Sequence, residues 1–128
     1  MLHFYGANMN SSKPHHKLYA WTEAMALVRL VYDATRDFPK EETYGLSAQI
    51  RRAAVSIPSN LAEGAGRNGQ KEFLQYLGIV RGSLSELETQ LLIAADLGYL
   101  PNEHQAFASL ERVSRFVTGL HKKLMTRD

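Results

Sequence analysis

The 128 residues, 45% of them hydrophobic, suffice for one domain that buries roughly two-thirds of its unfolded surface without covalent staples. The chain has no cysteine, which excludes a disulfide framework, thiolate metal sites and a cysteine nucleophile. No apolar run approaches the ~20 residues of a membrane span and the N-terminus lacks a signal-peptide core, so we expect a cytoplasmic protein without membrane contact.

The net charge of +2 is unevenly spread along the chain. Residues 1–20 contain Lys13 and Lys17 but no acid, and residues 21–110 are net acidic. Basic residues prevail again over 111–128, where Glu111 and Asp128 are set against Arg112, Arg115, Lys122, Lys123 and Arg127. Basic chain ends are suited to phosphates, although those near residue 125 also complement the dipole at a helix C-terminus. Both explanations stay open.

Residues 1–15 are expected to form an N-terminal extension, because the polar stretch from Asn10 to Pro14 is typical of a turn. The domain then covers residues 16–128. His15 and His16 are adjacent, and adjacent side chains on a loop rarely converge on one ion. We therefore expect no bound metal and no cofactor.

The first helix is predicted from about Leu18 to Asp37, and it carries two apolar stripes. One stripe comprises Leu18, Trp21, Met25, Val28 and Tyr32, and the other comprises Ala20, Ala24, Leu27, Val31, Ala34 and Phe38. At 100° per residue their joint arc is about 200° wide, whereas a surface helix needs an arc of only about 100°. The helix is therefore central in the bundle or shared with another subunit. We favour a subunit interface that includes Trp21, Leu27 and Val31.

The second helix is predicted over the stretch from Leu46 to Arg67, with Thr43 as a plausible N-cap. Its apolar side consists of Leu46, Ile50, Ala54, Ile57 and Leu61, and its polar side of Gln49, Arg52, Ser56, Asn60, Glu63 and Arg67. Pro58 removes one helical hydrogen bond, so we expect a kink or a break there. Gly64 and Gly66 end the helix, and Asn68 is suited to cap the next one.

The third helix is predicted from Gly69 or Gln70 to Leu97, with Gly98 as its C-terminal stop. Its apolar stripe consists of Phe73, Leu77, Val80, Leu84, Leu87, Leu91 and Ala94. Gly78 and Gly82 would let a neighbouring backbone approach closely.

The fourth helix is predicted from Pro101 or Asn102, where Asn102 and Gln105 have capping-box spacing, to about Met125. Its stripe consists of Ala106, Leu110, Val113, Val117, Leu120 and Leu124. Four helices with short links predict an all-α, antiparallel up-down-up-down four-helix bundle.

Residues 64–69, GAGRNG, match the dinucleotide fingerprint G-x-G-x-x-G, but that fingerprint requires a preceding strand, and here a helix precedes it. We interpret the segment as a link between two helices. A narrower possibility is that the N-terminus of the third helix, with Arg67 and Lys71 beside it, holds one phosphate.

Motifs for catalysis are missing from the sequence. No glutamate has a histidine three residues on, as a di-iron bundle requires, and there is no G-x-S-x-G nucleophile elbow. We therefore expect a protein that is not an enzyme.

The polar side of the second helix has a possible counterpart on the third, where Ser83, Glu86 and Gln90, and also Arg81, Ser85 and Glu88, recur at helical spacing. Arg51 and Arg52 are placed to meet Glu86 or Glu88. The polar side is a solvated face, a subunit contact made by Arg52, Asn60 and Glu63, or a ligand site, and these alternatives stay open.

Residues 41–64, EETYGLSAQIRRAAVSIPSNLAEG, and residues 82–91, GSLSELETQL, carry a resemblance to a known family. The chain resembles the bacterial four-helix-bundle family, some of whose members are encoded in intervening sequences of large-subunit ribosomal RNA genes. The resemblance covers roughly Leu18 to Leu100 and is most specific from Ser56 to Gly64, with Leu61 where isoleucine is expected.

This resemblance implies an antiparallel four-helix bundle assembled as a ring of five subunits, a homopentamer. A more distant similarity, to the accessory protein of diversity-generating retroelements, implies nucleic acid and a reverse transcriptase or other protein as partners.

Two hypotheses follow. The first is a non-enzymatic homo-oligomer that binds RNA or DNA through Arg51, Arg52, Arg67 and Lys71. The alternative is a protein-interaction scaffold with no nucleic-acid role.

Overall fold

The computed structural model describes residues 13–126. All the regular secondary structure within this range is helical. The elements are η1 (Pro14–Lys17), α2 (Tyr19–Thr35), η2 (Lys40–Glu42), α3 (Leu46–Ala65), α4 (Gln70–Asp96) and α5 (Gln105–Met125). Most of the expected extension, residues 1–12, lies outside the described part, as do residues 127 and 128. No helix among the described residues is both long and apolar enough to cross a membrane.

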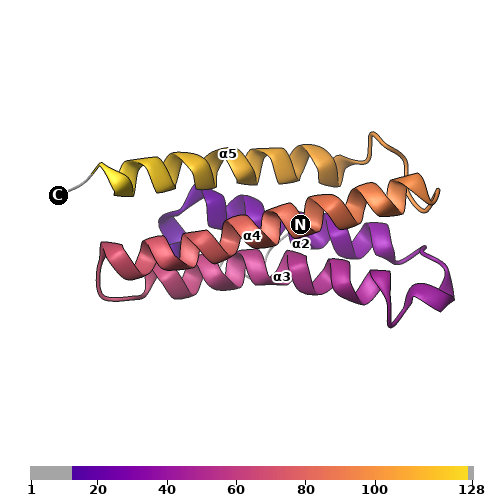
Figure 1. Cartoon of the computed structure of the whole chain (residues 1–128), viewed down its shortest axis with the longest axis horizontal. Helices are drawn as coiled ribbons and strands as arrows, with labels where there is room; N and C mark the ends of the chain where they lie inside the picture. The colour runs from indigo at the N-terminus through magenta and orange to yellow at the C-terminus, as the bar shows by residue number, and fades with distance from the viewer. Residues whose placement is uncertain (1–12, 127–128) are drawn as a thin grey trace.

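The four long helices run alternately in opposite directions and are joined by short links (Figure 1). α3 packs between α2 and α4, and α5 closes the square by packing against α2 and α4. Within residues 13–126 the diagonal pairs, α2 with α4 and α3 with α5, make no such contact. The predicted all-α four-helix bundle is therefore confirmed.

The core consists of apolar stripes from all four long helices. Side chains with no exposed surface include Ile50, Ile57, Leu61, Leu77, Val80, Leu87, Leu91, Val113 and Val117. Full burial of one such side chain contributes about 1.5–3 kcal/mol, so these stripes supply most of the driving force for folding. Three members of the stripes, Leu46, Phe73 and Leu120, pack against the core and stay partly exposed.

The two stripes of α2 have different fates. Leu27 and Val31 have no exposed surface and Trp21 is also buried, all within a single chain. These three side chains offer almost no surface to a second subunit, which corrects their assignment to a subunit interface. Met25 and Val28, which share a stripe with Trp21, stay half-buried.

Three predicted N-caps are wrong. Thr43 follows η2, and α3 begins after Gly45 with the Leu46 N–H donating to Glu42 Oε1 at 3.1 Å. Asn102 precedes α5, whose N-cap is His104: its Nδ1 accepts from the Ala106 N–H at 3.0 Å.

The predicted N-cap of α4 is the third that is wrong. Gly69 takes the N-cap position in place of Asn68, with no side-chain cap. A capping side chain is thus chosen by the local path of the chain as well as by residue type.

Glycine ends α4 as expected. Gly98 has φ of +81°, a left-handed conformation that glycine adopts without strain. The Tyr99 N–H donates to the Ala94 carbonyl at 2.9 Å and the Gly98 N–H to the Ala95 carbonyl at 3.0 Å. These two bonds form a Schellman motif, which satisfies carbonyls that the helix end leaves open.

Pro58 does not break α3, which runs through it as one helix from Leu46 to Ala65. Pro58 is buried in the core, so its packing offsets the hydrogen bond that its ring nitrogen cannot donate. The Asn60 Nδ2 donates to the Ser56 carbonyl at 2.8 Å and ties this turn together.

Candidate functional site

Ser56, on the polar side of α3, meets α4. The hydroxyl oxygens of Ser56 and Ser83 lie 2.7 Å apart, and Ser56 Oγ is also 2.7 Å from the Ala53 carbonyl oxygen. Because a hydroxyl has one proton, Ser83 donates to Ser56 when Ser56 donates to Ala53. The two helices are therefore joined by a hydrogen bond near their midpoints.

Arg51 faces α2, which corrects its predicted contact with Glu86 or Glu88. Its Nε donates to the Thr35 hydroxyl at 2.7 Å, and its guanidinium carbon lies 4.5 Å from the centroid of the Tyr32 ring. Glu86 instead accepts from Gln90 on its own helix at 3.1 Å. Arg51 is thus held in place between α2 and α3.

A groove of about 630 Å³ opens between α2 and α3. It is lined by Tyr32, Ala48, Arg51, Arg52, Val55, Ser56, Ser59 and Asn60. Arg52 and Asn60, two of the predicted interface residues, lie in this groove, whereas Glu63 does not. Tyr32 and Val55 are 38% and 39% exposed, so the groove presents apolar surface that the single chain leaves open.

Glu63 pairs with the end of its own helix and with α4. Arg67 donates to Glu63 Oε2 at 2.8 Å, and the Tyr76 hydroxyl donates to the same oxygen at 3.0 Å. These hydrogen bonds, that of Tyr76 first, lower the pKa of Glu63 below its ordinary value, and the carboxylate and Tyr76 raise the pKa of Arg67. The charge of Arg67 is therefore largely balanced by Glu63.

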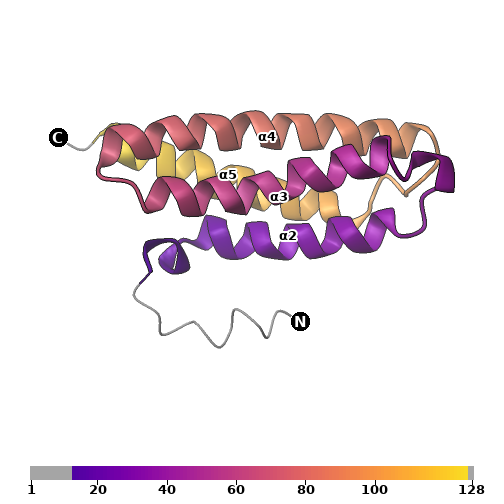
Figure 2. The same cartoon turned by 90° about the horizontal axis from the view of Figure 1, so that it is seen from below.

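Basic residues gather at one end of the bundle, the end drawn at the left of Figure 2. The Gln70 side-chain amide donates to the Leu124 carbonyl, which holds the first turn of α4 beside the last turn of α5. The start of α2, the α3–α4 link and the end of α5 all lie here. We call this the basic end; among the described residues it carries Lys13, Lys17, Arg67, Lys71, Lys122 and Lys123, with the carboxylates of Glu63 and Glu72.

The opposite end, which we call the acidic end, holds the α2–α3 and α4–α5 links. Its acidic residues are Asp37, Glu41, Glu42, Asp96 and Glu103, set against Arg36 and Lys40. Glu42 bridges the two links, because it accepts from Leu46 and also from the Tyr99 hydroxyl at 3.1 Å. The bundle is therefore charge-separated along its long axis.

The four predicted nucleic-acid-binding residues do not form one patch. Arg67 and Lys71 lie at the basic end, but Arg51 and Arg52 lie about 20 Å back along α3 at 1.5 Å per residue. Lys71 is exposed beside the first turn of α4.

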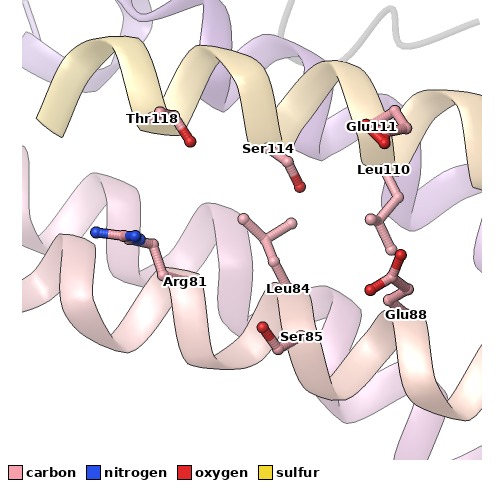
Figure 3. Close-up of a pocket in the computed structure, with 8 residues that line it drawn as sticks. All are labelled: Arg81, Leu84, Ser85, Glu88, Leu110, Glu111, Ser114 and Thr118. Carbon is pink, nitrogen blue, oxygen red and sulfur yellow. The ribbon is translucent and has the colours of Figure 1, made fainter. Parts of the chain in front are cut away.

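A second groove, of about 290 Å³, separates α4 from α5 (Figure 3). Arg81, Ser85 and Glu88 of α4 line this groove with residues of α5, which corrects the expectation that they meet the polar side of α3. Ser114 and Thr118 of α5 lie opposite them, and Glu111 and Glu88 line the groove from opposite helices. Among the described residues that line this groove there is no histidine, so its hydroxyls have no imidazole base within it.

The structure contains an exposed aromatic pair that the sequence did not predict. Tyr19 at the start of α2 stacks on Phe116 of α5, with ring centroids 5.8 Å apart. Tyr19 and Phe116 are far apart in the sequence, and the packing of α2 against α5 brings them together. Tyr44 lies at the acidic end and is 96% exposed.

Comparison with known proteins gives one family. A family model described as "23S rRNA-intervening sequence protein" matches residues 16–119. The match runs from η1 into α5. It includes every residue that lines the α2–α3 groove and the α4–α5 groove. None of the curated proteins matches the chain.

Proposed function

The chain belongs to the 23S rRNA-intervening sequence protein family, and on this premise we propose that it is a non-enzymatic, homo-oligomeric bundle that binds RNA or DNA through its basic end. The carrying observation is topological. An up-down-up-down bundle returns its two chain ends to the same end of the molecule. The basic segments at the two ends of the sequence therefore come together, next to Lys71.

The basic end suits a polyphosphate chain. Lys71, Lys122 and Lys123 are exposed, and within residues 13–126 none of the three is in an ion pair. Arg67 contributes less, because Glu63 balances its charge. The acidic end repels phosphate, so the field along the bundle directs a nucleic acid to the lysines.

Self-association is supported by the groove between α2 and α3. Its apolar residues Tyr32 and Val55 are open to solvent in the single chain, and Arg52 and Asn60 stand beside them as polar contacts. The ring of five subunits is what the family resemblance implies.

The test compares two charge changes of equal size at opposite ends of the bundle. Lys71→Glu and Lys122→Glu are combined in one variant, and the control is the pair Lys40→Glu and Arg36→Glu at the acidic end. Fluorescence anisotropy with labelled RNA and DNA is measured at about 50 and 200 mM salt.

We expect the native chain to bind more weakly at the higher salt, because phosphate neutralisation releases counterions. The basic-end variant should lose most of its affinity and show a flatter salt dependence, while the control keeps the native slope. Absence of binding at low salt, or equal losses in the two variants, would overturn the proposal.

A scaffold without a nucleic-acid role is the second candidate. The observation that favours it is the same groove between α2 and α3, because its exposed apolar surface can contact another protein without any nucleic acid. An assembled protein that purifies without nucleic acid and binds none at low salt would support this candidate over the first.

A further inference from the structure

The Tyr19–Phe116 pair lies on the surface of the bundle. The two rings are nearly parallel, at 28°, and their centroids are 5.8 Å apart. Tyr19 is 76% exposed and Phe116 is 40% exposed. Burial therefore does not account for this stack, and a broad π-face of Tyr19 is open to solvent.

The pair lies in a groove of about 260 Å³ between the start of α2 and α5. The other residues that line the groove are Lys17, Leu18, Ala20, Leu120 and Lys123. Lys17 comes from η1 and Lys123 from the last turn of α5, so the two ammonium groups reach the groove from two different elements. Both lysines are exposed, and within residues 13–126 neither forms an ion pair.

The charges around this groove are of one sign. No carboxylate is among the described residues that line it. The nearest acid along α2, Glu23, is one turn further on and is held by Arg112 Nε at 3.0 Å. A ligand here thus meets an aromatic face and two cations.

We infer that this groove binds single-stranded nucleic acid, with one base stacked on Tyr19 and the flanking phosphates contacted by Lys17 and Lys123. Aromatic side chains beside lysines are the arrangement that single strands use, because every base has a π-face and every linkage has a phosphate. A duplex keeps its bases stacked on one another and cannot offer one to the ring. The inference rests on the proposed function and adds to it the strand type and the site.

Lys123 connects this groove with the basic end, since it belongs to both. Its neighbour Lys122 and Lys71 then continue the positive surface across the end of the bundle. The phosphates that follow a base stacked on Tyr19 would therefore meet these lysines, and the strand would continue onto the basic end of the proposed function.

The experiment uses the full chain and three labelled probes: a 12-nucleotide oligouridylate, the matching deoxy strand, and a 12-base-pair RNA duplex. The variant is Tyr19→Leu, which removes the π-face but keeps an apolar side chain. The control is Tyr44→Leu, at a tyrosine of the acidic end that is also largely exposed. Circular dichroism and native mass spectrometry check the fold and the assembly of each.

We expect Tyr19→Leu to weaken binding of both single strands by about 5- to 100-fold and to leave the duplex unchanged. Tyr44→Leu should bind all three probes like the native chain. Lys123→Gln should weaken the single strands and flatten their salt dependence, because one phosphate contact is lost.

Single-strand affinity that is unchanged in Tyr19→Leu would overturn this inference and leave the proposed function standing. A native chain that binds none of the probes at low salt would overturn both. A Tyr19→Leu variant with native affinity but a smaller assembled mass would identify the pair as a subunit contact and so overturn the site. A loss confined to the RNA or the DNA strand would overturn base stacking as its cause.

Discussion

The hydroxyl oxygens of Ser56 and Ser83 lie 2.7 Å apart and join α3 to α4 through a hydrogen bond between part-buried side chains. Ser56 lies in the stretch that carries the family resemblance most specifically. The same serine faces the groove between α2 and α3, so one side chain links helix packing with the proposed assembly surface.

This bond should appear as a coupling in stability. Ser56→Ala and Ser83→Ala should each lower the free energy of unfolding by about 1 kcal/mol, because each removes the hydrogen bond between α3 and α4. In urea unfolding, the double variant should lose less than the sum of the two. Ser59→Ala, an exposed serine on α3, is the control, with a change below about 0.5 kcal/mol. Strictly additive losses would contradict the bond.

Gly64 should be the least replaceable glycine of the bundle. A Cβ at this position would lie 2.6 Å from Tyr76 Cβ, so α3 and α4 would have to move apart. Gly64→Ala should therefore destabilise the fold by about 1–3 kcal/mol.

Gly78 is the matched control for Gly64. A Cβ at Gly78 meets nothing within 4 Å, so Gly78→Ala should stabilise α4 by about 0.5–1 kcal/mol through helix propensity. Thermal unfolding measures both variants. A Gly64→Ala protein as stable as Gly78→Ala would refute the close approach of α3 and α4.

Glu63 should titrate below its ordinary pKa of 4.5. Its hydrogen bonds from Tyr76 and Arg67 favour the ionised carboxylate in the folded protein. The folded-state pKa is thus lower than the unfolded one, so the pair stabilises the fold above the unfolded pKa and this contribution is lost as pH falls through the folded pKa.

Carboxyl NMR titration measures this shift. Tyr76→Phe should return the Glu63 pKa part of the way to its ordinary value, since the Tyr76 hydrogen bond is the largest cause of the shift. Tyr44→Phe, which changes a distant hydroxyl, should leave the titration of Glu63 unaltered. Equal midpoints for Glu63 in the native chain and in Tyr76→Phe would show that this hydroxyl does not bond the carboxylate.

If the groove between α2 and α3 joins subunits, a charged residue introduced there should weaken the assembly. Val55 is 39% exposed, so Val55→Asp is compatible with the folded chain. At a subunit contact, however, it would place a carboxylate where an apolar side chain is buried, and native mass spectrometry should show dissociation.

Ile79→Asp is the matched variant for this test. Ile79 is 50% exposed on α4, beside Gly78. If Ile79→Asp dissociates the assembly and Val55→Asp does not, the contact lies on α4 and the assignment to the α2–α3 groove fails.

The bundle itself was predictable because its stripes are long. Ile50, Ala54, Ile57 and Leu61 repeat at steps of three and four, and such a repeat leaves a helix little choice of which side to bury. The helix starts were less predictable. Thr43 and Asn102 have the right chemistry for N-caps, but the links place Gly45 and His104 there instead.

Pairings between distant segments could not be predicted from spacing. Gly78 and Gly82 were expected to admit a neighbouring backbone, yet both face open space, and Gly64 is the glycine that α4 approaches closely. Likewise Arg51 contacts Thr35 rather than Glu86, because the rotation of α3 within the bundle decides which neighbour it meets. Such contacts depend on how the helices rotate and pair, which a one-dimensional pattern leaves undetermined.

The separation of charge between the two ends gives the molecule a direction. Copies of the bundle that pack side by side with their axes parallel would collect every basic end on one rim and every acidic end on the other. Their aligned dipoles would repel one another, and a polyanion bound along the basic rim would relieve part of that repulsion. Nucleic acid would then neutralise the basic rim and stabilise the assembly, and the assembly would bind nucleic acid on that rim only.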